Sequence, residues 1–323
     1  MRCSLELASD PQFISLSNLI TLLRLSGLAA PSPQLNDVFE AVFHVLHRAG
    51  SSSHLFTKNY HIGFGKIDVR TVTANGVEIR GIGQQDIGGD APRAFGSLEH
   101  KYVQRDYGLT LVEKWSTDNN VTLEASVEDK FLAGAKVTFL ASLSAQTGKR
   151  NAGLKFAYRR PFLHLTTDVD LDFAGPIVRS SAVSSYNGVR FGGNIVFDSA
   201  KSAITRYNLA LGLGASRYTL HAGTTHFRDF EMGVYNRVDQ NLEVGFQSNF
   251  STTGGNTLLG IGAKYDLDNT ASVKAKVDTV GQVGLSYTQE LRKGIKLTLS
   301  SLINGQNLSA GGHRYGFGLE VDV

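Results

Sequence analysis

The C-terminal part of the chain alternates strictly between apolar and polar positions. The apolar positions are Ile295, Leu297 and Leu299 in one segment and, after a turn rich in glycine and asparagine, Tyr315, Phe317, Leu319 and Val321 in the next. A period of two predicts β-strands with one apolar and one polar face. Because the pattern runs to the last residues, the final strand needs a partner that hides its edge. A closed barrel in lipid provides one.

The same alternation continues through the chain from about His61. The clearest example is residues 162–173, where leucine, valine and phenylalanine occupy one face and histidine, threonine and aspartate the other. Turn signals that favour positive φ separate the segments, at Asn75-Gly76, Thr147-Gly148, Asn187-Gly188, Gly254-Gly255 and Asn304-Gly305. Division at such turns predicts about nineteen strands of roughly 8–12 residues, long enough to cross a bilayer when tilted.

Residues 1–55 differ from the rest. A leucine-rich stretch over 13–30 contains Arg24 and is too short and too polar for a membrane span. Apolar residues at helical spacing then predict an amphipathic helix over 35–48, although partial disorder of 1–50 is equally compatible with the sequence. A mitochondrial presequence over 1–30 is disfavoured by Glu6 and Asp10. We therefore expect an all-β transmembrane barrel over 56–323, preceded by a divergent, helical segment over 1–55.

Composition narrows the range of possible folds and functions. The 323 residues include 35 glycines and only 6 prolines, which suits many paired strands and tight turns. A mean hydropathy of -0.10 hides any lipid-facing band, because alternation averages it out. A net charge of +3 argues against a nucleic-acid partner, and the single cysteine excludes an intramolecular disulfide. Neither an enzyme motif nor a metal or cofactor site is evident, and the aspartates at 168, 170 and 172 lack a calcium-binding loop.

Several motifs support a more specific interpretation. They include Phe56-Thr57-Lys58, Gly96-Ser97-Leu98-Glu99, Tyr107-Gly108-Leu109-Thr110, Glu113-Lys114-Trp115, Thr117-Asp118-Asn119 and Ala263-Lys264-Tyr265. Together with 294–300 and 310–320 they resemble the eukaryotic mitochondrial porin family, the voltage-dependent anion channels. The resemblance implies a nineteen-stranded barrel in the mitochondrial outer membrane that carries metabolite anions, nucleotides and small ions. It also implies a helix inside the pore, homo-oligomers, and docking of kinases or apoptosis regulators.

Glu113 is the most distinctive candidate side chain. On the predicted strand it shares the apolar register with Leu109, Leu111 and Trp115, so it should face lipid. A carboxylate in lipid is costly and therefore a functional candidate, unless it lies near the interface and reaches water. The family has a glutamate at the matching place, linked to gating and to partner or ligand binding, which favours a functional role.

Two further groups of residues follow from pattern and resemblance. Cations expected on the lumen register would bias the pore towards anions; they are Lys58, Lys66, Arg70, Lys155, Arg159, Lys276 and Lys296. The last strand fits the sorting signal of mitochondrial barrels, a polar residue, a glycine and two hydrophobic residues at fixed offsets; these are Arg314, Gly316, Leu319 and Val321. The alternative is an ordinary final strand.

The chain departs from the family near its N-terminus. Residues 1–50 are longer and unrelated, and Asn59 and His61 stand where the family's hinge has glycines. Fewer glycines predict a stiffer connection. The leading hypothesis is a passive, weakly anion-selective and voltage-gated channel. The alternatives are a poorly conducting paralogue that acts as a docking protein in the membrane and a protein-import pore of the same architecture.

Overall fold

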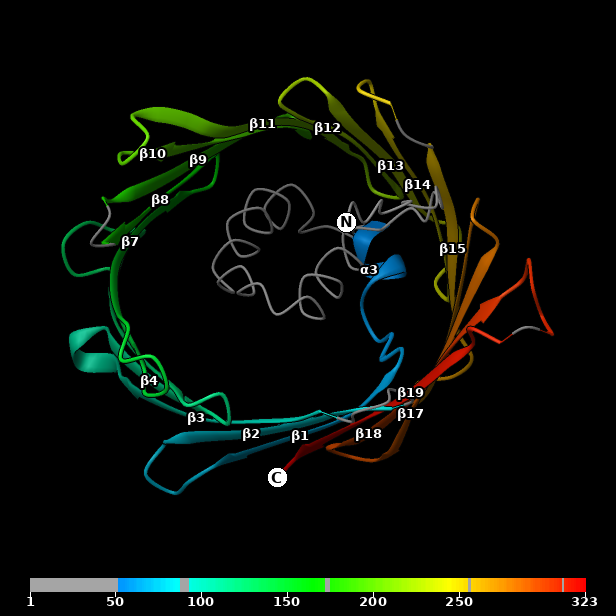
Figure 1. Cartoon of the computed structure of the whole chain (residues 1–323), viewed down its shortest axis with the longest axis horizontal. Coiled ribbons are helices and arrows are strands. Elements are labelled where there is room, and N and C mark those ends of the chain that lie inside the picture. Colours follow the sequence, from blue (N-terminus) through cyan, green and yellow to red (C-terminus); the bar gives the residue numbers. More distant parts are fainter. Residues whose placement is uncertain (1–51, 88–92, 172–174, 255–256, 310) are drawn as a thin grey trace, which may run out of the picture. The chain divides into compact units, whose positions relative to one another are not determined.

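The computed structural model describes residues 52–87, 93–171, 175–254, 257–309 and 311–323. The chain divides into two compact units, residues 1–41 and 42–323, and every described residue belongs to the second. That unit contains a single nineteen-stranded sheet, which closes on itself (Figure 1).

The elements follow one another with short connections. They are the helix α3 (Ser52–Phe56), the strands β1 (Phe64–Val72), β2 (Glu78–Asp86) and β3 (Ala94–Gln104), the 3₁₀ turn η1 (Arg105–Tyr107), and then β4 (Leu109–Ser116), β5 (Asn120–Glu128), β6 (Ala135–Ser144), β7 (Arg150–Arg160), β8 (Leu163–Leu171), β9 (Ile177–Tyr186), β10 (Val189–Asp198), β11 (Ala203–Gly214), β12 (Tyr218–Thr225), β13 (Asp229–Arg237), β14 (Leu242–Ser251), β15 (Leu258–Asp266), β16 (Ala271–Asp278), β17 (Gln282–Arg292), β18 (Ile295–Asn304) and β19 (Arg314–Asp322).

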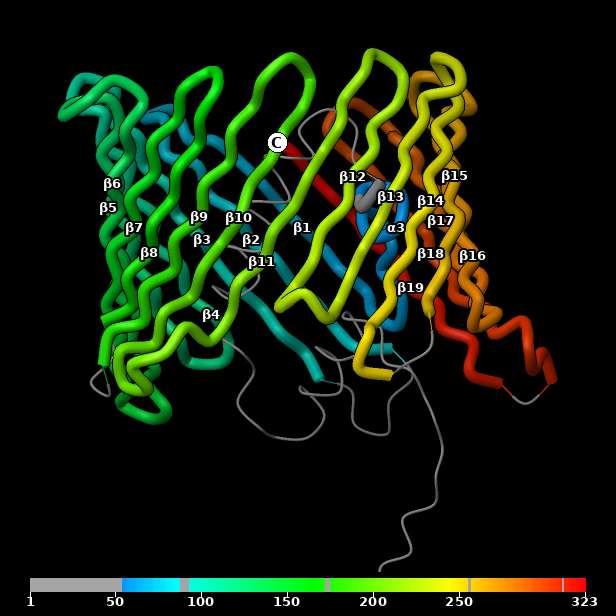
Figure 2. The backbone as a smooth tube through the Cα atoms, turned by 90° about the horizontal axis from the view of Figure 1, so that it is seen from above, coloured from blue at the N-terminus to red at the C-terminus, as the bar shows by residue number. Residues whose placement is uncertain are grey.

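Each strand pairs antiparallel with the next, and the barrel closes where β1 meets β19 (Figure 2). An up-and-down chain of nineteen strands has its first and last strands pointing the same way, so this seam is parallel. Its register runs from Gly65 opposite Phe317 to Arg70 opposite Asp322. The predicted all-β barrel of about nineteen strands, with a helical element near its start, is confirmed.

The turn chemistry explains most of the hairpins. Asn187 and Gly188 have φ of 48° and 82°, the positive values that a tight two-residue hairpin needs. Gly76, Gly148 and Gly254 also have positive φ, as the sequence predicts. The connection after β18 differs, because positive φ occurs at Gly311 and Gly312 and not at Asn304-Gly305. That connection is longer than a tight turn.

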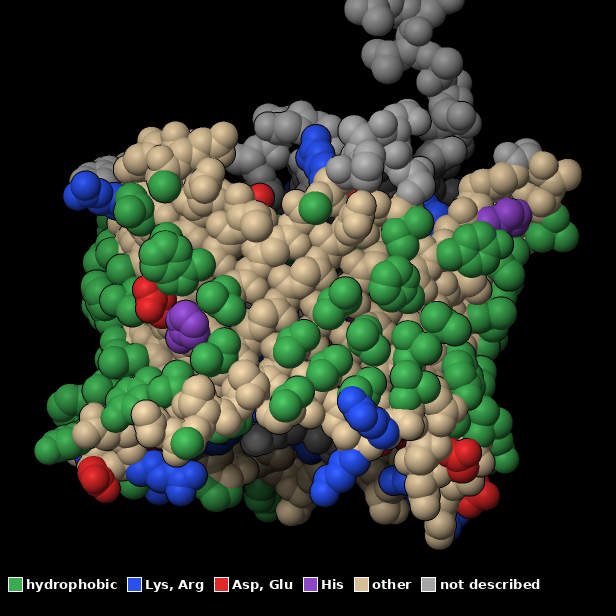
Figure 3. All heavy atoms as spheres, turned by 90° about the horizontal axis from the view of Figure 1, so that it is seen from below, with side chains coloured by type: hydrophobic (Ala, Val, Ile, Leu, Met, Phe, Trp, Pro, Cys, Tyr) green, Lys and Arg blue, Asp and Glu red, His purple; other side chains and the backbone are tan. Residues whose placement is uncertain are grey.

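The two faces of the sheet have opposite character. Apolar side chains project outward and remain exposed, as at Trp115 (51 %) and Leu123 (46 %). Polar side chains project inward, as at Thr298 and Asn194, which are both buried. Figure 3 shows hydrophobic side chains spread over one outer side of the wall. The barrel therefore has an apolar exterior and a polar lumen instead of a central apolar core.

Several predictions concern residues outside the described part of the chain. The predicted helix over 35–48 and most of the segment 1–55 lie outside the described residues, as do Asp172 and Phe173. The first strand begins at Phe64. In the described part of the chain, no helix is long and apolar enough to cross a membrane.

Candidate functional site

Residues 54–61 connect α3 to the barrel and lie against the inner wall; we call them the anchor segment. Contacts join α3 to β13, β14, β15 and β16, and Figure 1 shows this helix inside the ring of strands, next to β14 and β15. The anchor segment therefore lies inside the barrel, against these strands.

Glycines on the wall make room for two apolar side chains of the anchor segment. Leu55 is 1 % exposed, and its Cδ1 atom lies 2.7 Å from the place that a Cβ at Gly245 would occupy. The ring of Phe56 covers Gly260 and Gly262, where an added Cβ would come within 3.3 and 3.1 Å of it. Larger residues at these inner positions would push the helix away from the wall.

Two lysines of β16 bind the carbonyl groups at the end of α3. Lys276 Nζ donates a hydrogen bond to the Phe56 carbonyl at 2.6 Å and lies 4.2 Å from the centroid of the Tyr60 ring. Lys274 Nζ donates to the carbonyls of His54 and Lys58, both at 3.3 Å. The C-terminal carbonyls of a helix lack intrahelical partners and favour cations. These contacts therefore hold α3 through its main chain.

The next residues of the anchor segment are bound in the same manner. The Asn59 carbonyl accepts hydrogen bonds from Ser286 Oγ at 2.5 Å and Ser300 Oγ at 3.2 Å, and the amide of His61 donates to Ser300 Oγ at 3.1 Å. His61 crosses β19 where Gly316 leaves space, and a Cβ at Gly316 would collide with the His61 carbonyl. This glycine thus has a local packing role in addition to its place in the predicted sorting signal.

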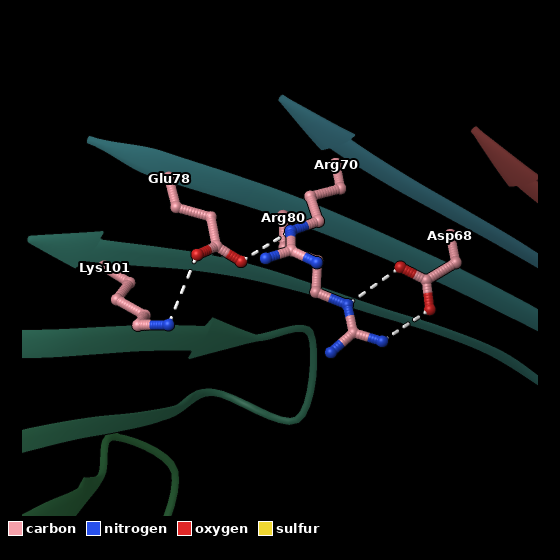
Figure 4. Close-up of polar contacts among 5 residues, drawn as sticks. All are labelled: Asp68, Arg70, Glu78, Arg80 and Lys101. Carbon is pink, nitrogen blue, oxygen red and sulfur yellow. Dashed lines mark hydrogen bonds and ion pairs between the residues drawn. The ribbon is translucent and has the colours of Figure 1, made fainter. Parts of the chain in front are cut away.

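A network of ion pairs covers the lumen wall of β1, β2 and β3 (Figure 4). Arg80 donates to both carboxylate oxygens of Asp68, at 2.8 and 2.7 Å. Arg70 Nε lies 2.6 Å from Glu78 Oε1, and Lys101 Nζ lies 3.3 Å from Glu78 Oε2. Most positive charges here have a carboxylate beside them, which weakens the attraction of this part of the wall for anions.

A different balance of charge occurs at one mouth of the barrel, beside the turns β7–β8 and β9–β10. A hollow there is lined by Arg159, Arg160, Pro161, Phe162, Leu163, His164, Val183, Ser185 and Arg190. Three arginines and a histidine contribute to this lining, and no carboxylate is among the described residues that form it. At the other ends of β8 and β9, Arg179 is paired with Asp170, whose Nη1 and Oδ2 atoms are 2.5 Å apart. The hollow is therefore lined by more basic than acidic side chains.

The structure places most of the predicted lumen cations on the inner register of the wall. These are Lys66, Arg70, Lys155, Arg159, Lys276 and Lys296. Lys58 belongs to the anchor segment. Their surroundings differ: Lys66 lies 3.0 Å from Asp68, Lys155 is opposite Asp168, and Lys296 is opposite Glu320. Only Arg159 contributes to the positive hollow, so the predicted cations do not form one site.

The remaining predicted residues occupy both faces. Glu113 is on the outer register of β4, with Leu111 and Trp115 two positions away on either side. On β19, Arg314 and Gly316 are on the inner register, while Leu319 and Val321 are on the outer one. This strand is paired on both sides, with β18 and with β1.

Sequence reasoning missed the roles of Lys274 and Asp68. It also missed Gly245, Gly260 and Gly262, which make room for Leu55 and Phe56. Lys274 is 3 % exposed, although it is a lysine on a wall that faces a lumen. Its spacing of two from Lys276 on an alternating strand is a signal that both face the same way. The sequence does not indicate that the two ammonium groups bind main-chain carbonyls.

Comparison with known proteins agrees with this architecture. The family profile described as "Eukaryotic porin" matches residues 46–316. The chain belongs to the eukaryotic porin family. It is 43 % identical over 273 residues to the non-selective voltage-gated ion channel VDAC2 of Meleagris gallopavo, covering 84 % of this chain and 92 % of that protein. It is 40 % identical over 269 residues to the voltage-dependent anion-selective channel of Drosophila melanogaster, covering 83 % and 95 %.

A human relative is similar to the same extent. The non-selective voltage-gated ion channel VDAC1 of Homo sapiens is 41 % identical over 273 residues, covering 84 % of this chain and 96 % of that protein. Among solved structures, a mutant porin of Rh. blastica shows a TM-score of 0.47 at 11 % identity, covering 80 % of this chain and 96 % of that one. As a member of the eukaryotic porin family, this protein is an integral membrane barrel whose lumen passes small solutes, which makes it a transporter.

Proposed function

We propose that this porin lies in the mitochondrial outer membrane, where it lets metabolite anions, nucleotides and inorganic ions diffuse passively with a weak preference for anions. The relatives named as anion-selective and voltage-gated channels support this proposal, since the match covers more than four fifths of the chain. Docking of kinases or apoptosis regulators, homo-oligomers and a sorting role for β19 stay predictions.

The observation that carries the proposal is the positively charged hollow at the mouth beside β7–β10. Arg159, His164 and Arg190 lie there on β7, β8 and β10, in a lining without carboxylates among the described residues. A cluster of one sign raises the local concentration of the opposite ion. The preference should be modest, because most cations beside β1–β3 are paired with Asp68 or Glu78.

The anchor segment supports the part of the proposal that concerns gating. Leu55, Lys274 and Lys276 attach it to the lumen wall, and displacement of a segment held there would change the width of the pore. Voltage acts on such a segment through its charges, at about 2.3 kcal/mol per elementary charge per 100 mV.

Recording from the purified chain in a planar bilayer tests the proposal. In a potassium chloride gradient, we expect a reversal potential that indicates a modest preference for chloride, and Arg159→Gln with Arg190→Gln should reduce it. Arg150→Gln is the matched control, because its side chain belongs to the outer register at the start of β7 and does not line the hollow. Cation preference in the unmodified channel would refute the selectivity. A chain that inserts but conducts no current would favour the docking alternative.

A further inference from the structure

The outer face of the barrel carries two ionisable side chains directly opposite each other. The register of β3 and β4 places His100 opposite Glu113, and both side chains are half-buried on the outward side. Residues directly opposite on neighbouring strands have Cβ atoms about 4.5–5.5 Å apart, within reach for a hydrogen bond between long polar side chains. Among the Asp, Glu, Lys, Arg and His side chains of the described strands, these two interrupt the outer register away from the strand ends.

Apolar residues surround this pair on every side. Ile79 of β2 is opposite His100, and Leu123 of β5 is opposite Glu113. Along the two strands the neighbours on the same face are Leu98, Tyr102, Leu111 and Trp115, which are 37–51 % exposed. Figure 3 shows one histidine and one acidic side chain next to each other in an otherwise hydrophobic area of the outer wall. The phenol of Tyr102 is the one other titratable group among these neighbours.

A single charge at this position would be costly. Charged side chains on the lipid face of a barrel destabilise it most strongly near the midplane of the bilayer, carboxylates less than Arg or Lys. A histidine and a glutamate together can hold one proton between them with no net charge. An opposite-charge pair across two strands also stabilises them. The juxtaposition therefore removes the cost that either residue would impose alone.

We propose that His100 positions Glu113, so that the two side chains form a hydrogen-bonded pair that faces lipid. Such a pair holds the Glu113 carboxyl group at the barrel surface between β3 and β4. Removal of either partner leaves the other polar group without this bond in the apolar face.

A double-mutant cycle in lipid vesicles tests this inference. It uses the full chain, His100→Gln, Glu113→Gln and the double variant, with unfolding by denaturant followed for each. We expect a favourable coupling that changes the folded-to-unfolded ratio by at least about threefold. Effects that either substitution has on the rest of the barrel cancel in the cycle.

Two controls separate the pair from general effects. A cycle on Tyr102→Phe and Leu111→Val, which are directly opposite on the same face, should give a smaller coupling. Infrared difference spectra against Glu113→Gln should show a Glu113 carboxyl band that shifts when His100 is replaced by glutamine. A coupling of zero, or a Glu113 carboxyl band that is the same with and without His100, overturns the proposal.

Discussion

Replacing Leu55 with alanine should release the anchor segment from the lumen wall. Leu55 is almost completely buried against Gly245, and it lies closer to this glycine than the Phe56 ring does. Its truncation removes buried methyl groups and leaves a cavity, which in protein cores costs about 2–5 kcal/mol. Because the barrel strands keep their own hydrogen bonds, the loss should appear in the docking of the segment. The ratio of released to docked segment should therefore rise by about 30-fold or more.

A spin label attached through Lys58→Cys reports this release, after Cys3→Ser has removed the native thiol. In the parent chain we expect an immobilised spectrum, because the main chain around residue 58 is held by Lys274 and Ser286. Leu55→Ala should add a mobile component and change the voltage at which the channel closes.

The matched control is Leu285→Ala on the outer face of β17, where the same atoms are lost without contact with the anchor segment. The reasoning fails if the spectrum of the Leu55→Ala chain shows no more mobile label than that control. It also fails if both variants mobilise the label equally, since the effect would then come from a weakened barrel.

Three further outcomes follow from the same contacts. Burial, with Lys66 nearby, lowers the pKa of His61; docking is therefore complete above pH of about 6.5 and weakens as pH falls below it, which the same label should detect between pH 7.5 and 5. Gly316→Val should displace the anchor segment and lower the unfolding midpoint more than Gly81→Val, where a side chain meets open space. Deletion of residues 1–50 should leave a barrel that inserts into vesicles, because β1 begins at Phe64; failure to insert would show that the deleted residues belong to the fold.

The alternation of apolar and polar residues was enough to predict the strands. A strand of this barrel pairs with its neighbours through main-chain hydrogen bonds, and its sequence needs only one apolar face and one polar face. The alternation also placed Glu113 on the outer face, since only the parity of neighbouring residues matters there. It could not find His100 as the opposite residue. That pairing depends on how many residues the β3–β4 connection uses, and a 3₁₀ turn over Arg105–Tyr107 sets that number.

The role of the lumen lysines was harder to predict for a related reason. On a strand, Lys276 looks the same whether its ammonium group faces open solvent or binds a carbonyl of a segment more than two hundred residues earlier. The sequence therefore predicts the face on which a charge lies but not its partner. In the same way, the replacement of hinge glycines by Asn59 and His61 predicts stiffness, whereas the structure shows attachment to Ser286 and Ser300.

The parallel seam between β1 and β19 has a consequence for how the protein is made. Its hydrogen bonds join Gly65–Arg70 to Phe317–Asp322, so they form only after almost the whole chain has left the ribosome. Until then both edges of the growing sheet are open, and open edges template aggregation. Closure across so long a loop is also slow compared with hairpin formation. Synthesis and membrane insertion must therefore be separate steps, with the unfinished edges covered by another protein in between.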